Sequence, residues 1–113
     1  MHSAFAKHDG PVLYRYEDVL TAASVDEFDR PMGDASVQVY LRQFPVTRTT
    51  EKGAWIDVYG TRRFVLLTAR KRFACESMDA ARESFIARKQ AQRRIYTARL
   101  RSINLAIEIA ERL

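Results

Sequence analysis

The chain ends in 36 residues, Met78 to Leu113, that contain neither glycine nor proline. Alanine, arginine, glutamine, leucine and glutamate dominate this stretch, and all of them favour a helix. Ser77 can cap it by accepting a hydrogen bond from a backbone N–H two or three residues later. One helix of this length would be roughly 54 Å long, more than so short a chain needs to cover its own core. We therefore expect a helix over residues 77–113, packed against a second copy or a partner, with a break near residue 102 left open.

The two halves of this helix differ in character. The second half is amphipathic, with apolar residues at steps of three and four: Ile95 or Tyr96, Leu100, Ile103, Ala106, Ile107 and Ala110. Continued from Phe85, the same stripe meets Arg88, Gln92 and Arg99. Two interpretations remain open. Either the arginine stems lie along the stripe and carry their charges to water, or the side facing the sheet holds a polar pocket for an anion.

Residues 36–49 carry the clearest strand signal before the helix. Val37, Val39 and Leu41 alternate with polar or amphipathic residues, which predicts one buried and one solvated face. Pro45 cannot donate to a ladder, so we expect a bulge or an edge position near residues 43–45. A hairpin turn should follow, with Gly53 at a position that needs a positive φ.

The remaining segments complete a sheet. Strands are expected at residues 12–16, 55–59 and 63–68, where β-branched and aromatic residues gather. The other segments are a disordered start (1–10), an acidic loop (17–34) that could hold a short helical turn around 16–23, and a short strand or irregular crossing (69–74). The sequence thus predicts one domain, 1–113, of the α+β class. Its sheet part, 12–74, would be an antiparallel β-meander of three to five strands, followed by the long C-terminal α-helix.

Charge is unevenly distributed along the chain. Residues 1–34 hold three basic and seven acidic residues, whereas residues 61–101 hold twelve basic and three acidic ones. This concentration predicts a positive field where sheet and helix meet, and hence an anionic partner. Nucleic acid, a nucleotide and an acidic protein face all remain possible. The single cysteine, Cys75, excludes an internal disulfide and is typical of a reducing cytoplasm, and no apolar run is long enough to span a membrane.

Signatures of catalysis are missing from the sequence. It has no P-loop, no glycine-rich dinucleotide motif, no nucleophile elbow and no zinc-protease motif. Its two histidines, His2 and His8, lie in the predicted disordered start, far in sequence from Cys75. We therefore expect a protein that is not an enzyme and that uses no metal and no cofactor.

Two sets of binding residues follow from the two interpretations of the helix. An enclosed anion pocket between sheet and helix would combine guanidinium groups, an amide and aromatic rings, namely Arg72, Phe73, Arg88, Gln92, Arg99 and Trp55. An open basic surface for a macromolecule would use Arg62, Arg82, Lys89, Arg93, Arg94 and Arg101.

Parts of residues 40–100 resemble a family of small phage and prophage accessory proteins of unassigned role. The resemblance lies in a Gly-Xaa-Trp-Ile hairpin, an Arg-Phe-Ala step and a helix with a Phe-Ile-Xaa-Arg-Lys core and a nearby glutamine. The residues that carry it are Gly53, Trp55, Ile56, Arg72, Phe73, Ala74, Phe85, Ile86, Arg88, Lys89 and Gln92. Where this chain has Cys75 to Ser77, the family more often has an aromatic-Pro-Thr step.

In architecture, the expected fold resembles the phage anti-Thoeris sponge proteins. Those proteins are not enzymes; they sequester cyclic nucleotide signals between sheet and helix with arginine and aromatic residues from paired subunits. The resemblance implies a homodimer, or an assembly of dimers, that acts in the host bacterial cytoplasm as a counter-defence protein and binds an anionic nucleotide. The alternative is a binder of nucleic acid or of a bacterial defence protein such as a CRISPR effector.

Overall fold

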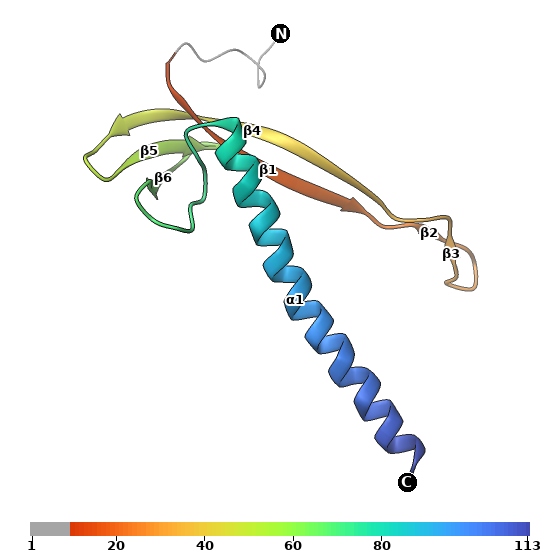
Figure 1. The fold of residues 1–113 in the computed structure, drawn as a ribbon. Helices are drawn as coiled ribbons and strands as arrows, with labels where there is room; N and C mark the ends of the chain where they lie inside the picture. Colours follow the sequence, from red (N-terminus) through yellow and green to blue (C-terminus); the bar gives the residue numbers. More distant parts are fainter. Residues whose placement is uncertain (1–9) are drawn as a thin grey trace.

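The computed structural model describes residues 10–113 and confirms the predicted α+β architecture (Figure 1). The strands in this part of the chain are β1 (Val12–Thr21), β2 (Ser24–Val25), β3 (Pro31–Met32), β4 (Ser36–Thr49), β5 (Gly53–Val58) and β6 (Thr61–Leu66). One helix, α1 (Met78–Glu111), follows them. The predicted disordered start lies outside the described residues except for Gly10, which is exposed.

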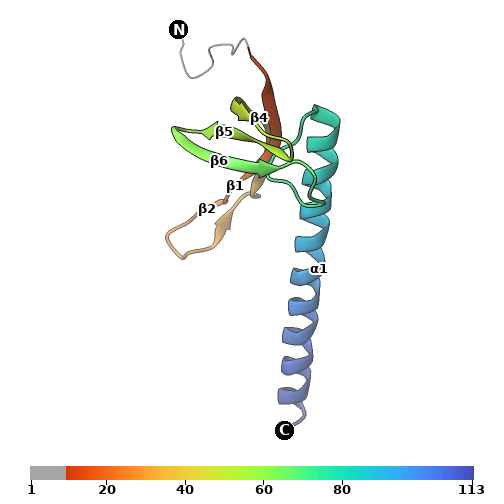
Figure 2. The same ribbon diagram turned by 90° about the vertical axis from the view of Figure 1, so that its left-hand side faces the viewer.

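The main sheet is antiparallel, with the strand order β1-β4-β5-β6, and β2 and β3 form a separate pair. The long strand β4 divides its length between two neighbours: residues 36–45 pair with β1, and residues 46–49 pair with β5. As a result β1 and the first part of β4 form a two-stranded ribbon that extends away from the rest of the sheet and ends in the β2–β3 hairpin (Figure 1). Figure 2 shows α1 running past one side of the sheet and well beyond it.

Strand β1 continues through residues that the sequence predicts to be an acidic loop. Every residue from Val12 to Thr21 has a partner in β4. Glu17 accepts hydrogen bonds from Arg15 Nε at 3.2 Å and from Arg42 Nε at 3.1 Å. Because pairing with β4 satisfies the backbone and the arginines neutralise the carboxylate, the strand is stable where its composition favours a loop. The predictions of a loop over all of residues 17–34 and of a helical turn around 16–23 are therefore wrong.

The core lies where β4, β5 and β6 meet the crossing segment that leads to the helix. Its buried apolar residues are Leu13, Phe44, Ala54, Ile56, Val65 and Ala74. Phe44 contacts the rings of Tyr59 and Phe73, each with a centroid separation of 5.8 Å. This small core leaves much of β1 and α1 without cover.

Two predictions about turns and bulges need correction. Gly53 does not have a positive φ; it is required because a Cβ there would lie 2.1 Å from the carbonyl oxygen of Val65 on β6. The positive φ values in the hairpins of the main sheet fall instead at Tyr59 and Gly60, between β5 and β6. The register shift in β4 lies between Val46 and Arg48, not at residues 43–45, because pairing passes from β1 to β5 at that point. The alternative of an edge position is confirmed, since residues 43–45 pair with β1 alone.

Residues 69–74 form an irregular crossing rather than a strand, and they bring Cys75 to the edge of β1. Cys75 exchanges two backbone hydrogen bonds with Tyr14, of 2.7 and 2.8 Å. Its side chain is 1% exposed, in keeping with a small residue at a crowded corner.

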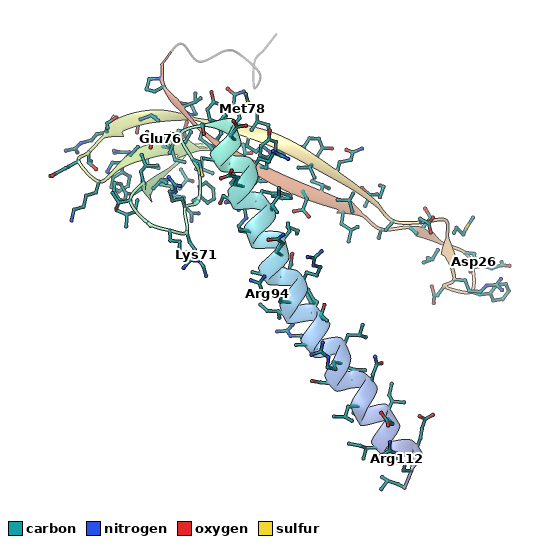
Figure 3. The ribbon with its side chains drawn as sticks, in the orientation of Figure 1. Asp26, Lys71, Glu76, Met78, Arg94 and Arg112 are labelled. Carbon is teal, nitrogen blue, oxygen red and sulfur yellow. The ribbon has the colours of Figure 1, made fainter. Side chains whose placement is uncertain are left out.

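The helix begins as predicted and runs without a break. The Ser77 hydroxyl accepts a hydrogen bond from the Ala80 backbone N–H at 3.1 Å, and α1 continues through residue 102 to Glu111. Only the first half of the helix is near the sheet. From Gln92 onward every residue is exposed, which Figure 3 shows around Arg94 and Arg112.

The alternation predicted for β4 is present, but the apolar face of the ribbon is not covered. Val37 is 61% exposed and Val39 is 52% exposed. The prediction that one face of β4 is buried is therefore wrong for residues 37–39 of the single chain.

Candidate functional site

Three contacts fix the first half of α1 along the edge of β1. The first is the backbone pair between Tyr14 and Cys75. Next along the strand, Arg88 Nη2 donates to the Tyr16 carbonyl oxygen at 2.7 Å. The third is the ion pair of Lys89 Nζ with Asp18 Oδ2, at 2.9 Å. Residues 14, 16 and 18 are alternate residues of β1, so these contacts follow one another along the strand, from the corner before the helix to Lys89 on α1.

Beside this line lies an open groove of about 620 Å³ between β1 and α1. Four of the side chains around it are basic and two are acidic, which leaves a net charge of +2. Two aromatic rings and a glutamine amide complete the polar and planar groups. The lining residues are Arg15, Glu17, Asp18, Phe85, Arg88, Lys89, Ala91, Gln92, Ile95, Tyr96 and Arg99.

Both carboxylates of the groove are already paired. Glu17 bridges Arg15 and Arg42, as described above. Lys89 hydrogen-bonds Asp18, and this contact, more than any other influence, lowers the pKa of that carboxyl below its usual value. Each carboxylate therefore already has a cationic partner, and the excess positive charge belongs to the arginines.

Arg88 is the most unusual of these arginines. Its side chain is half-buried, and burial is the main reason why its pKa is lowered, with repulsion from Arg15 as the second cause. It remains protonated because a guanidinium has so high an intrinsic pKa. Among residues 10–113, no carboxylate lies within ion-pair distance of Arg88, and its one hydrogen bond goes to the Tyr16 carbonyl. A partly desolvated cation without a carboxylate partner is a favourable contact for an anion.

The structure brings together three of the residues predicted for the anion pocket. Arg88, Gln92 and Arg99 all line the groove, as their spacing of four and seven residues on one helix predicts. The guanidinium of Arg99 lies 5.7 Å from the ring centroid of Tyr96, and that of Arg88 lies 5.5 Å from the centroid of Phe85. The site is an open groove, however, and not the enclosed pocket that the sequence suggests.

The other three predicted pocket residues lie elsewhere. The Phe73 ring already contacts two guanidinium groups, since Arg63 lies 3.8 Å from its centroid and Arg15 lies 4.3 Å from it. The Phe73 carbonyl also accepts a hydrogen bond of 2.6 Å from Arg15 Nη1. Arg72 Nη1 points to the Leu67 carbonyl oxygen, 3.4 Å away. Neither Phe73 nor Arg72 lines the groove.

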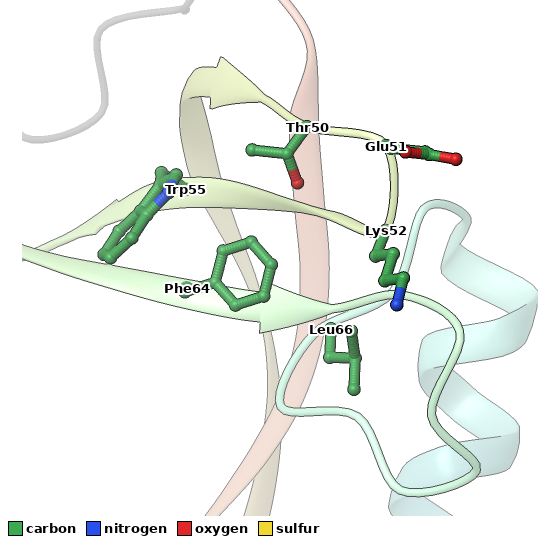
Figure 4. A pocket seen from close by; sticks show the side chains of 6 residues that line it. All are labelled: Thr50, Glu51, Lys52, Trp55, Phe64 and Leu66. Carbon is green, nitrogen blue, oxygen red and sulfur yellow. The ribbon is translucent and has the colours of Figure 1, made fainter.

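Trp55 belongs to a second, separate hollow of about 420 Å³ on the β5–β6 hairpin (Figure 4). Its ring lies 5.3 Å from that of Phe64 on the neighbouring strand. The hollow is lined by Thr50, Glu51, Lys52, Trp55, Phe64 and Leu66. Arg62, from the predicted basic surface, lies on β6 with its guanidinium 5.3 Å from the Trp55 centroid, and it does not line the groove beside α1.

The predicted basic surface is divided. Lys89 lies in the groove and pairs with Asp18. The four remaining helix residues, Arg82, Arg93, Arg94 and Arg101, are all exposed. By helical spacing, Arg82 and Arg93 share one face, whereas Arg94 and Arg101 share another, so they form two lines instead of one stripe.

Sequence reasoning missed the contribution of β1 to the site. Arg15 lies in the predicted strand but was not recognised as a groove residue, and Glu17 and Asp18 line the groove because β1 runs five residues further than predicted. The sequence signal for a longer β1 lay in the length of β4, because its first ten residues need a pairing strand of the same length. Phe85 and Tyr96 were recognised only as apolar helix residues.

The described residues 10–113 contain no cluster of three histidine, cysteine, aspartate or glutamate side chains arranged as a metal site. No helix in this part of the chain is long and apolar enough to cross a membrane. Comparison with protein-family models, with curated proteins and with solved structures found no match to this chain.

Proposed function

We propose that this protein is a non-enzymatic binding protein that holds an anionic nucleotide in the groove between β1 and α1. The observation that carries the proposal is the convergence of Arg15, Arg88 and Arg99 on one groove that also contains Phe85 and Tyr96. Guanidinium groups bind phosphate in a two-pronged geometry, and an aromatic face accepts a stacked base. Tyr96 and Phe85 would be the aromatic rings of this site, in place of the predicted Phe73 and Trp55.

The paired carboxylates support binding rather than catalysis. A general base needs an accessible lone pair and a pKa near the working pH. Glu17 is engaged by two arginines, and the pKa of Asp18 is lowered further from neutrality by Lys89. The groove also lacks serine, cysteine and histidine among its lining residues.

The resemblance to small phage accessory proteins, together with the architectural resemblance to the anti-Thoeris sponge proteins, suggests a biological setting for this binding. In that setting the protein acts as a phage counter-defence factor in the host bacterial cytoplasm and sequesters a cyclic nucleotide signal. Sequestration requires affinity and no turnover, which agrees with an open, positively charged groove whose acidic groups are occupied.

The proposal is tested by titrating a cyclic dinucleotide into the protein by calorimetry at fixed, moderate salt. Each guanidinium contact to phosphate contributes about 1.5–3 kcal/mol, so Arg88→Ala should weaken binding roughly 10- to 150-fold. Arg99→Ala should also weaken binding; this side chain is exposed, which makes the variant a check against misfolding. Arg94→Ala is the matched control, because it removes the same charge from another face of α1 and should bind normally.

The competing function is recognition of a macromolecule through the exposed arginines of α1. It is favoured by the exposure of Arg82, Arg93, Arg94 and Arg101, none of which is ion-paired within the described part of the chain. Duplex DNA binding with a steep salt dependence, lost in Arg94→Ala and retained in Arg88→Ala, would support it and contradict the nucleotide proposal.

A further inference from the structure

The second half of α1 presents an apolar face with nothing packed on it. Leu100 and Ile103 are each 57% exposed, and Ile107 is 53% exposed. In Figure 1 this half of the helix extends away from the sheet. A contiguous group of exposed apolar side chains of this size usually marks a surface that a partner covers.

The spacing of these residues is that of a helix-pairing seam. Tyr96, Leu100, Ile103, Ile107 and Ala110 follow one another at steps of four, three, four and three residues. This is the heptad pattern in which two helices bury a narrow stripe against each other.

Charge along the seam favours an antiparallel over a parallel pair. Arg93 and Arg94 lie at one end of the stripe, and Glu108 and Glu111 lie at the other. A parallel pair would place arginines beside arginines, whereas an antiparallel pair places each end beside its opposite. Arg112 ion-pairs with Glu108 within the same helix, which leaves Glu111 as the principal acidic partner for Arg93 across the pair.

The amount of exposed surface is also that of a subunit rather than a monomer. The chain exposes 9339 Å², whereas a compact monomer of 13.1 kDa exposes roughly 6,400 Å². Full exposure of residues 1–9 would account for only about half of the difference. The radius of gyration is 20.1 Å, against about 13 Å for a compact chain of this length. The remaining excess, roughly 1,400 Å² per chain, lies within the roughly 1,000–2,500 Å² that each subunit of an obligate homodimer buries.

We propose that α1 pairs antiparallel with α1 of a second copy, about a two-fold axis that passes between Arg101 and Ser102. In this register Tyr96 lies opposite Ile107 of the partner subunit, and Leu100 lies opposite Ile103 of the partner subunit. Arg93 then lies next to Glu111 of the partner subunit. The end of the partner's helix reaches Gln92 and Tyr96, so it closes the end of the groove that these residues line.

The test is disulfide cross-linking in a Cys75→Ala background, with sedimentation of the unmodified protein alongside. A mixture of Tyr96→Cys and Ile107→Cys chains should cross-link under mild oxidation, and neither variant should cross-link alone. In the antiparallel register, two copies of residue 96 are offset by about 16 Å along the axis, beyond the reach of a disulfide. The unmodified protein should sediment at twice its mass of 13.1 kDa.

The matched control uses Ala98→Cys mixed with Leu105→Cys. These positions lie at the same level relative to the axis but on the far side of the helix, so they should not cross-link. Circular dichroism confirms that each variant is folded.

Three results would overturn the proposal. A monomer at ~100 μM would show that the seam is too weak to pair. Cross-linking of Tyr96→Cys with itself would show a parallel pair. A dimer without the 96–107 cross-link would show that α1 does not pair with α1 in this register. The alternative interface would then be the exposed apolar face of the β-ribbon, formed by Leu20, Val37 and Val39.

Discussion

Replacing Gly53 with alanine should destabilise the sheet far more than an ordinary glycine substitution. The new Cβ would lie 2.1 Å from the carbonyl oxygen of Val65 and 3.1 Å from its carbonyl carbon. An ordinary carbon–oxygen contact is about 3.3 Å or longer, so β5 and β6 would have to separate by roughly 1 Å at this point. The third neighbour, Phe64 Cζ at 2.8 Å, is the end of a side chain and can move aside.

The magnitude follows from what that separation breaks. Overpacking a rigid site costs about 1–3 kcal/mol, and weakening hydrogen bonds at the end of the β5–β6 ladder adds about 1 kcal/mol each. One of these bonds runs from the Leu67 N–H to the Lys52 carbonyl oxygen, 3.0 Å apart. We expect a loss of roughly 3–5 kcal/mol in the free energy of unfolding, or about 10–25 °C in Tm.

Urea denaturation followed by circular dichroism measures this loss. Gly60→Ala is the control, because Gly60 has a φ of +88° and open space around it. Its substitution introduces backbone strain without a clash and should cost only about 1–2 kcal/mol. If Gly53→Ala were as stable as Gly60→Ala or more so, the close approach of β5 to β6 would be wrong.

Two further predictions concern the attachment and the start of α1. Lys89→Met removes the partner that lowers the pKa of Asp18. Because the pKa of Asp18 is lower in the folded than in the unfolded protein, the ion pair stabilises the fold above about pH 4. This stabilisation is lost as the pH falls through the pKa of Asp18 in the folded protein. Urea denaturation at pH 6 and pH 2 should therefore show that the variant loses less unfolding free energy at low pH than the unmodified protein, by no more than about 1 kcal/mol for so exposed a pair. If both proteins lost the same amount, Lys89 would not be the group that stabilises the Asp18 carboxylate. Ser77→Ala removes the cap on Ala80 and should cost about 1 kcal/mol, with faster hydrogen exchange confined to the first helical turn; uniform exchange changes would argue against it.

The parts of the fold that the sequence predicts well are those governed by local rules. Ser77 and the absence of glycine and proline after it define the start and continuity of α1, because capping and helix propensity act over a few residues. The hairpins around β5 were similarly recognisable from alternation and turn residues. The ends of β5 and β6 differ from the predicted ones by no more than two residues.

The parts that failed depend on contacts between distant segments. Glu17 and Asp18 look like loop residues until Arg42 and Lys89 are placed beside them, 25 and 71 residues further along the chain. Gly53 looks like a turn residue until the Val65 carbonyl is seen next to it. For the site, helical spacing correctly grouped Arg88 with Gln92 and Arg99, but spacing alone could not show that Phe73 stacks against Arg15 and Arg63.

The attachment of α1 to β1 has a consequence for the order of folding. The hairpins of β4, β5 and β6 close over short loops, whereas Arg88 reaches the Tyr16 carbonyl across 72 residues. Closing a long loop is entropically more costly, so the meander should form early and the helix should dock late. During synthesis, β1 is therefore complete long before Cys75 and Arg88 emerge to occupy its edge. Until then that edge is open to pairing with another chain, and the docking of the helix ends this exposure.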